Sequence, residues 1–240
     1  MNKFKLSMLC IGFLAATYSA FAQVTVLWNF SDGTGAYASG TPDNFQVSVF
    51  TIGNSLGTVN SPISSTSASS GYASASGTNN LGNAQAGGAF SATTSGYFQF
   101  TITPNASYRF AVSDFDFGVR STSTGAQFYD LRASTDNFAT STSVTTGSIA
   151  TNSSWSYKDN TFTSFVSTAI GQTVTFRLYA FGNSGSPSNN TVTTRLDDIS
   201  LTVSTIFTAP NSAVPEPASF GLLAGLMVFA GVASRRGRRV

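Results

Sequence analysis

No histidine occurs in this chain of 240 residues, and only one cysteine, Cys10. Without histidine there can be no Ser-His-Asp triad, no imidazole base and no histidine-ligated zinc. Cys10 lies in an apolar segment near the N-terminus that we expect to be removed. The mature protein would then lack thiol nucleophiles and disulfide bonds, so its fold must depend on a hydrophobic core or on bound metal ions.

Charged residues are also few, at 9% of the chain. The formal net charge of +2 arises at the ends, where two lysines open the sequence and four arginines nearly close it. Residues 23–214 hold six basic residues against nine aspartates, a net charge of −3. This region has no basic stripe of the kind that binds polyanions, so we expect no nucleic-acid partner.

The first 22 residues have the three parts of a secretory signal peptide. Two lysines open the segment, an apolar stretch covers residues 6–16, and Ala20 and Ala22 place small residues where signal peptidase reads them. We therefore expect cleavage after Ala22. The apolar stretch is shorter than the ~20 residues of a spanning helix, which makes a retained N-terminal anchor the less favoured alternative.

The C-terminal segment, residues 214–240, combines a short motif, an apolar run and a basic cluster. The motif consists of Val214, Pro215, Glu216 and Pro217. Its prolines disfavour helix and keep the glutamate in an extended segment. Residues 218–234 are predicted to form one transmembrane helix. The positive-inside rule would keep the basic cluster in the cytoplasm; it contains Arg235, Arg236, Arg238 and Arg239.

This order of motif, helix and basic cluster closely resembles the PEP-CTERM sorting signal. The resemblance implies that an exosortase-type membrane peptidase processes the tail near the motif. It implies a precursor anchored in the inner membrane with its body outside the cytoplasm, and a final place at the cell surface or in the extracellular matrix. Extracellular polysaccharide is then an expected partner. The alternative is a plain C-terminal anchor that follows a chance Pro-Glu-Pro.

The body, residues 23–205, is rich in aromatic, β-branched and turn-forming residues, a composition typical of an all-β domain. Residues 60–96, rich in Ser, Gly and Asn, are predicted to form an ordered surface loop, and 206–213 a linker. No helical periodicity is present. Alternation of apolar and polar residues predicts strands at 24–30, 45–50, 97–103, 108–120, 127–132, 155–157 (loop or edge strand), 161–166, 173–181 and 192–204. The expected fold is an antiparallel jelly-roll β-sandwich.

Three stretches of the body, 118–136, 175–179 and 195–201, resemble a jelly-roll domain often found ahead of PEP-CTERM tails. The last stretch also ends in Asp-Asp-Ile-x-Leu, which is similar to the final strand of galactose-binding-like carbohydrate modules. The resemblance implies the jelly-roll fold. It does not by itself establish a ligand.

In such modules, an aspartate of the final strand helps to hold a structural calcium ion. For this chain the resemblance implies a calcium site formed by Asn29, Asp32 and Asp198. Because adjacent strand residues point to opposite faces, we expect only one of Asp197 and Asp198 to face the core side. The alternative is that the aspartate pair ends a strand and binds Arg195 or backbone amides.

Two further groups of residues are candidates for carbohydrate chemistry. Trp155 and Tyr157 combine large rings with polar neighbours and are predicted to form a sugar platform; the alternative is that Trp155 caps the core. Asp114 and Asp116 could share one strand face and serve as a glycosidase pair. A slip in alternation near Ser113 predicts a β-bulge there, and solvated aspartates on an outer face are the favoured interpretation of this pair.

The sequence thus favours an exported, non-enzymatic envelope protein with weak glycan binding. One alternative is a structural or adhesive matrix component without specific sugar binding. Another, less favoured, is a polysaccharide-cleaving hydrolase.

Mass spectrometry of the protein from native cells tests both predicted ends at once. We expect a mature N-terminus at Gln23, because Ala20 and Ala22 direct signal peptidase, and a C-terminus close to the 214–217 motif. An intact tail through Val240 would contradict exosortase-type processing and support a plain anchor.

Overall fold

The computed structural model describes residues 23–37, 39–40, 43–85, 87–183 and 188–208. The chain divides into two compact units, Met1–Phe207 and Thr208–Val240, and the account below concerns the first. The predicted signal peptide, sorting motif, transmembrane helix and basic cluster lie outside the described residues. Among the residues that are described, no helix is long and apolar enough to cross a membrane.

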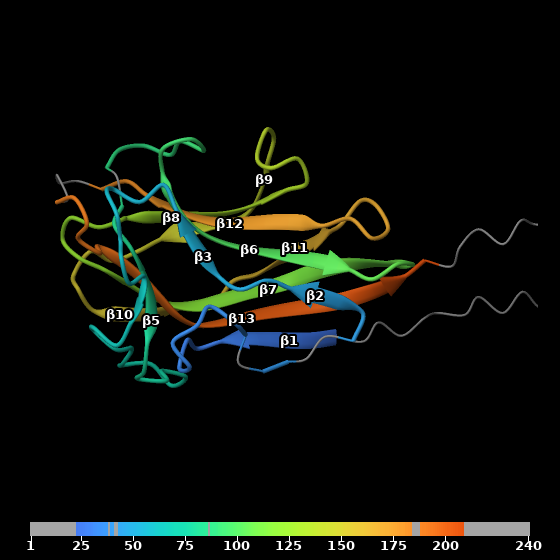
Figure 1. The fold of residues 1–240 in the computed structure, drawn as a ribbon, viewed down its shortest axis with the longest axis horizontal. Helices are drawn as coiled ribbons and strands as arrows, with labels where there is room; N and C mark the ends of the chain where they lie inside the picture. The colour runs from blue at the N-terminus through green and yellow to red at the C-terminus, as the bar shows by residue number, and fades with distance from the viewer. Residues whose placement is uncertain (1–22, 38, 41–42, 86, 184–187, 209–240) are drawn as a thin grey trace, which may run out of the picture. The chain divides into compact units, whose positions relative to one another are not determined.

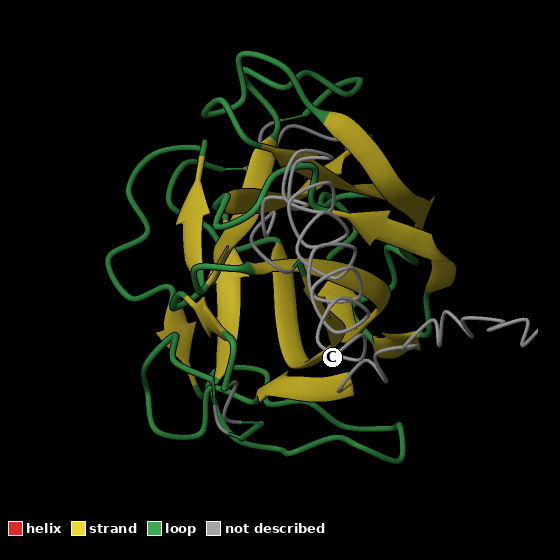
Figure 2. Cartoon of the chain, turned by 90° about the vertical axis from the view of Figure 1, so that its right-hand side faces the viewer, coloured by secondary structure: helices red, strands yellow, loops and turns green. Residues whose placement is uncertain are grey.

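The described residues form two antiparallel sheets that pack face to face (Figures 1 and 2). Sheet A consists of β1 (Gln23–Trp28), β4 (Ile63–Ser64), β5 (Asn80–Asn83), β7 (Tyr108–Ser121), β10 (Trp155–Lys158), β11 (Thr161–Val166) and β13 (Thr194–Phe207). Sheet B consists of β2 (Phe45–Val47), β3 (Thr51–Gly53), β6 (Gly96–Pro104), β8 (Phe128–Ser134), β9 (Thr142–Ser148) and β12 (Val174–Phe181). This confirms the predicted all-β, antiparallel jelly-roll sandwich.

Strand pairing places chain segments that are distant in sequence side by side. Sheet A has the order β10-β7-β13-β5-β4, with β1 also pairing with β13 and β11 with β7. Sheet B has the order β2-β6-β12-β8-β9, with β3 also pairing with β6. The central strand β13 runs to Phe207, two residues past the predicted end of the body.

Aromatic rings from both sheets fill the core. On β6, Phe98, Phe100 and Ile102 are buried and alternate with half-buried residues, as a strand with one inward face requires. The ring of Phe100 is stacked on Phe176 of the same sheet, with centroids 5.1 Å apart, and on Phe115 of the opposite sheet, at 5.8 Å. Phe100 thus links the two layers.

The prediction of one strand over 45–50 is wrong in its second half. The chain forms β2, leaves the ladder and pairs again as β3, so Val49 is 51% exposed whereas Phe50 is buried. The Phe50 ring lies 4.9 Å from Phe100 and 5.0 Å from Trp28. Aromatic packing therefore overrides the period-two alternation at this point.

The predicted loop over 60–96 contains a buried strand, β5. Its sequence, Asn-Leu-Gly-Asn, has one hydrophobic residue, yet all four positions are buried. Asn80 Nδ2 donates to Thr66 O at 3.0 Å, and Asn83 Nδ2 donates to Gly53 O and Tyr97 O, both at 3.1 Å. These bonds give both buried amide nitrogens acceptors, so a polar segment can join the sheet.

Replacing Phe100 with alanine tests the role of the inter-sheet stack. We expect the free energy of unfolding to fall by about 3–5 kcal/mol, because the change removes a fully buried ring and leaves a cavity. Val49→Ala, at an exposed position, should change stability by no more than about 0.5 kcal/mol. Chemical denaturation of both variants measures the difference, and equal effects would contradict a core centred on Phe100.

Candidate functional site

A β-bulge in β13 places two carboxylates on the outer side of sheet A. The register with β7 shifts between Asp197 and Ser200, and Asp198 has a left-handed backbone with a φ of 49°. Ser76 contacts both acids: its Oγ donates to Asp197 Oδ2 at 3.3 Å, and its N–H donates to both Asp198 oxygens at 3.1 Å. The expectation that the two aspartates point to opposite faces is therefore wrong, because the bulge interrupts the alternation.

The loop between β4 and β5, residues 65–79, lies against this outer face, and we call it the covering loop. Tyr72 Oη donates to Asp198 Oδ2 at 2.6 Å. The phenol lies over Gly118 of β7, where an added Cβ atom would overlap it. Near the start of the loop, Ser67 O accepts a hydrogen bond from Trp155 Nε1 of β10 at 3.0 Å. Because Gly118 has no side chain, the ring of Tyr72 fits against β7 and anchors the loop there.

Burial changes the acid–base behaviour of the anchoring groups. Burial, followed by repulsion from Asp198, raises the pKa of Asp197 to about 7 from its ordinary value of 3.8. Burial and the hydrogen bond to Asp198 raise the pKa of Tyr72 well above its usual range. Asp197 therefore lies beneath the loop as a carboxyl group that titrates near neutral pH.

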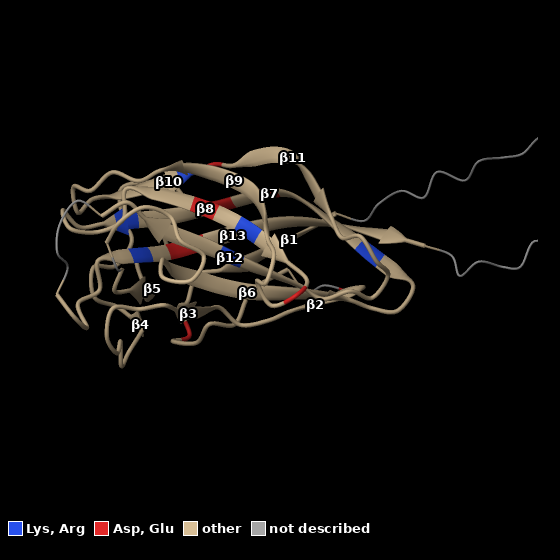
Figure 3. Ribbon diagram, turned by 90° about the horizontal axis from the view of Figure 1, so that it is seen from above, with Lys and Arg blue, Asp and Glu red and all other residues tan. Residues whose placement is uncertain are grey.

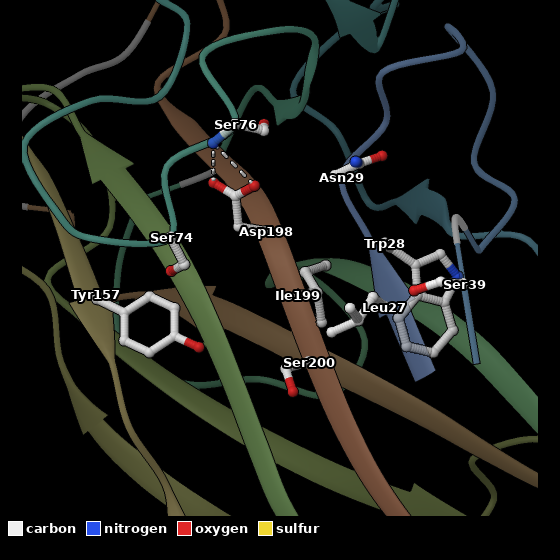
Figure 4. Close-up of a pocket in the computed structure, with 10 residues that line it drawn as sticks. All are labelled: Leu27, Trp28, Asn29, Ser39, Ser74, Ser76, Tyr157, Asp198, Ile199 and Ser200. Carbon is white, nitrogen blue, oxygen red and sulfur yellow. Dashed lines mark hydrogen bonds between the residues drawn. The ribbon is translucent and has the colours of Figure 1, made fainter. Parts of the chain in front are cut away.

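A cavity of about 320 Å³ opens beside the bulge (Figure 4), and we call it the β13 cavity. It is lined by Leu27, Trp28, Asn29, Ser39, Ser74, Ser76, Tyr157, Asp198, Ile199 and Ser200. Tyr157 on β10 and Leu27 on β1 lie at its two sides in Figure 4, with β7 and β13 between their strands. The two strands are three spacings of ~4.8 Å apart, roughly 14 Å across the sheet.

The lining of the β13 cavity mixes apolar surface with directional polar groups. Tyr157 is 37% exposed and Leu27 is 40% exposed, so a ring face and an aliphatic side chain are accessible. The indole Nε1 of Trp28 is buried and has no hydrogen-bond partner within the described residues. The Asp198 carboxylate is fixed by Tyr72 and Ser76. The cavity therefore offers a fixed acceptor beside apolar surface.

Trp155, the other predicted platform residue, lies in a separate, more open hollow of about 520 Å³. This hollow also contains Arg120, which pairs directly with Trp155 between β7 and β10 and donates from Nε to Ser153 O at 2.8 Å. Trp155 is half-buried and does not belong to the hydrophobic core. Strand β10 thus brings Trp155 and Tyr157 to one edge, while the covering loop contributes lining residues to both hollows.

The residues of the predicted calcium site are only partly brought together. Asn29 and Asp198 line the β13 cavity, but Asp32 does not, and its oxygens accept hydrogen bonds from the N–H and Oγ1 of Thr34, both at 2.8 Å. These bonds lower the pKa of Asp32. Within the described residues, no group of three or more acidic, histidine or cysteine side chains could hold a metal ion. Calcium binding stays a prediction, which an unchanged melting midpoint on adding a chelator would contradict.

The predicted bulge at Ser113 is confirmed by the register shift between Thr202 and Val203 of the facing strand. Asp114 accepts hydrogen bonds from Ser113 Oγ at 2.6 Å and Thr161 Oγ1 at 2.7 Å. Asp116 accepts one from the Asn160 N–H at 2.8 Å, and its pKa is raised by burial and by the nearby Asp159 and Asp114. Both carboxylates thus hold the β10–β11 connection. The hydrolase alternative stays an untested prediction.

No protein-family model and no curated protein matches the chain. Similar solved structures include the CBM22-1–GH10 modules of xylanase Xyn10B from Clostridium thermocellum, in complex with xylohexaose, with 10% identity and a TM-score of 0.35. The match covers 79% of this chain and 30% of that chain. The K3 cleaved adhesin domain of Lys-gingipain from Porphyromonas gingivalis shows 14% identity and a TM-score of 0.34, covering 76% of this chain and 99% of that chain.

A family 11 carbohydrate-binding module from Clostridium thermocellum, in complex with a β-1,3-1,4-mixed-linked tetrasaccharide, shows 10% identity and a TM-score of 0.30. The match covers 75% of this chain and 96% of that chain. Identities and TM-scores this low give no information about a shared ligand or activity. The functional residues must therefore be identified from the geometry of this chain.

Asp197→Asn tests the buried carboxyl group under the covering loop. Between about pH 4 and pH 7 the folded protein keeps a proton on Asp197 that the unfolded chain has lost, so rising pH lowers the free energy of unfolding. The variant cannot ionise, and we expect it to be more stable than the parent by on the order of a few kcal/mol at about pH 8, with little difference at about pH 4.

Denaturation midpoints of parent and variant across this range provide the measurement. Asp43→Asn, at an exposed position, is the matched control and should show no such divergence. A constant difference between Asp197→Asn and the parent from low to high pH would show that folding does not shift the pKa of Asp197.

Proposed function

We propose that this protein is an exported, non-enzymatic glycan-binding protein and that the β13 cavity is its sugar site. The observation that carries the proposal is the composition of this cavity. An exposed ring and an aliphatic side chain lie there beside a fixed carboxylate. Sugars present apolar C–H faces and polar hydroxyl edges, and this lining is complementary to both.

Asp198 and Tyr157 have distinct roles in the proposed binding. Asp198 accepts a hydroxyl proton in a charge-assisted hydrogen bond, since a carboxylate has about four acceptor positions and its three bonds from Tyr72 and Ser76 leave capacity. The Tyr157 ring packs against the sugar face.

The position of the cavity is compatible with a chain of sugars as the ligand. Tyr157 and Leu27 belong to strands separated by β7 and β13, so a ligand that contacts both crosses two strands of the sheet. This agrees with the extracellular polysaccharide that the sorting tail implies as a partner.

Export and sorting are part of the same proposal and rest on the sequence alone. Signal peptidase would release the chain after Ala22. An exosortase-type peptidase would then act near Val214, Pro215, Glu216 and Pro217, and the body would reach the cell surface or matrix.

Tyr157→Ala tests the sugar site on a glycan array followed by titration calorimetry of the best ligand. We expect binding to weaken roughly tenfold, because the variant loses the ring face that packs on the sugar. Phe128→Ala is the matched control, since Phe128 is also an exposed ring, at 45%, but belongs to sheet B. Trp155→Ala distinguishes the second hollow from the β13 cavity.

Two results would contradict the proposal. One is the absence of glycan binding by the parent protein, which together with self-association in the absence of glycan would favour a structural matrix component. The other is glycan binding that Tyr157→Ala leaves unchanged. Release of reducing ends that disappears in Asp116→Asn would instead support the hydrolase alternative.

A further inference from the structure

An arginine on the outer face of sheet B is held between two aromatic rings. The guanidinium carbon of Arg177, on β12, lies 4.1 Å from the ring centroid of Tyr97 and 4.0 Å from that of Phe138. Tyr97 comes from the neighbouring strand β6, and Phe138 from the loop between β8 and β9. Rings on both sides leave only the edge of the guanidinium plane available to a ligand.

Hydrogen bonds fix the rotation of this guanidinium within its plane. Arg177 Nε donates to Gln99 Oε1 at 2.7 Å, and Nη1 donates to Tyr179 Oη at 3.3 Å. Tyr179 is itself held, because its hydroxyl donates to Ala92 O at 3.2 Å. No bond from Nη2 is found among the described residues, so the side chain presents an oriented N–H edge that its neighbours do not saturate.

Among the described residues, no carboxylate forms a salt bridge with Arg177. Arg177 lies directly opposite Arg132 in the β12–β8 register, and like charges in that position repel. Arg132 forms a salt bridge with Asp130 at 2.7 Å, the ion pair found within the described residues. The other acid nearby, Asp136, accepts hydrogen bonds from Thr140 and from Ser134. Figure 3 shows how sparse charged positions are on the sandwich.

Phe138, the second ring against Arg177, has an unfavourable backbone conformation. Asn137 and Phe138 both have left-handed φ values, 57° and 64°. A bulky residue rarely adopts this conformation unless surrounding contacts enforce it. The loop therefore maintains strain that keeps the Phe138 ring against Arg177, and the cation is preorganised before any ligand arrives.

We propose that Arg177 binds the carboxylate or sulfate group of an acidic polysaccharide on the outer face of sheet B. Its planar N–H edge matches the two oxygens of such a group, as arginine does in bidentate recognition. The side chains of Gln99, Thr101 and Thr175 surround it on the facing positions of β6 and β12 and supply polar partners for sugar hydroxyls. The inference deepens the proposed glycan binding by naming an acidic ligand class, but it uses the opposite sheet from the β13 cavity.

Polygalacturonate and dextran sulfate are suitable probes, with methyl-esterified polygalacturonate and unmodified dextran as their neutral counterparts. Affinity electrophoresis of the full-length protein should show retardation by at least one acidic polymer and not by its neutral counterpart. The retardation should disappear at about 1 M salt, where screening extends over only ~3 Å. Arg177→Gln should reduce the affinity at least about tenfold.

Arg177→Lys separates recognition from simple charge. It keeps the positive charge but loses the planar edge, so we expect affinity to fall severalfold while the melting midpoint shows that the fold is retained. Lys158→Gln, which removes a charge from sheet A, should bind as the parent does. Tyr157→Ala should also leave acidic-polymer binding intact, so failure of the β13 cavity and failure of this site can be told apart.

Equal binding of acidic and neutral polymers by the parent would overturn the proposal. So would acidic-polymer binding that survives in both Arg177 variants, or that falls equally in Lys158→Gln, because the attraction would then reflect general charge. Absence of binding to both acidic polymers would show that Arg177 only holds the Phe138 loop against sheet B.

Discussion

The packing of Phe100 between Phe176 and Phe115 is the contact on which the sandwich depends. Residues 23–240 contain no cysteine, so no disulfide can join the two sheets. Ring stacking across the interior takes that role, and it also positions Trp28, whose ring centroid lies 5.6 Å from that of Phe100. Trp28 is at the same time a wall of the β13 cavity. The core therefore supports the inner wall of the candidate site.

A second constraint is the bulge at Asp198 within β13, where the covering loop is attached to the sheet. One inserted residue places Asp197 and Asp198 on the same side of sheet A, where Ser76 bonds to both. The covering loop has no regular structure of its own between β4 and β5, yet hydrogen bonds to the sheet fix its position. The loop's position thus depends on the geometry of two adjacent carboxyl groups.

Both proposed sites use aromatic rings and oriented polar groups, but the chain brings these residues together in different ways. The β13 cavity forms where β1, β10, β13 and the covering loop meet, and its groups are distant in sequence. The Arg177 site forms from one cross-strand row of sheet B and one loop residue. Two sites on opposite sheets would allow one protein to contact two polysaccharide strands, which suits a matrix component.

The sequence predicts most of the fold, because a strand with one inward face has a period of two. Phe98, Phe100 and Ile102 follow this rule, and β6 lies where it was expected. The rule fails at Val49 and Phe50, where ring packing decides the orientation, and at β5, where buried asparagines replace hydrophobic residues. Such bonds join residues far apart in the chain, and no local pattern contains them.

The sites were predictable to a smaller extent. Tyr157 and Asp198 could be proposed from residue type, and both line the same cavity. The same-side placement of Asp197 and Asp198 was not predicted, because the alternation was assumed to continue through this pair. Leu196 and Ile199 are both buried, and this spacing of three breaks the alternation as it does near Ser113. Arg177 stands on the polar face of an evident strand, but its partner Phe138 lies 39 residues earlier, in a loop without periodicity.

The lack of a side chain at Gly118 limits which sequence changes the protein can accept. Because the phenol of Tyr72 occupies the space that a side chain at 118 would need, these two positions can change only together. At Thr66 and Ser67 the covering loop contacts the sheet through backbone oxygens, so these side chains could be exchanged without loss of those bonds. Relatives of this protein should therefore differ at such positions of the loop while keeping the glycine and the tyrosine, so that ligand preference can diverge on an unchanged fold.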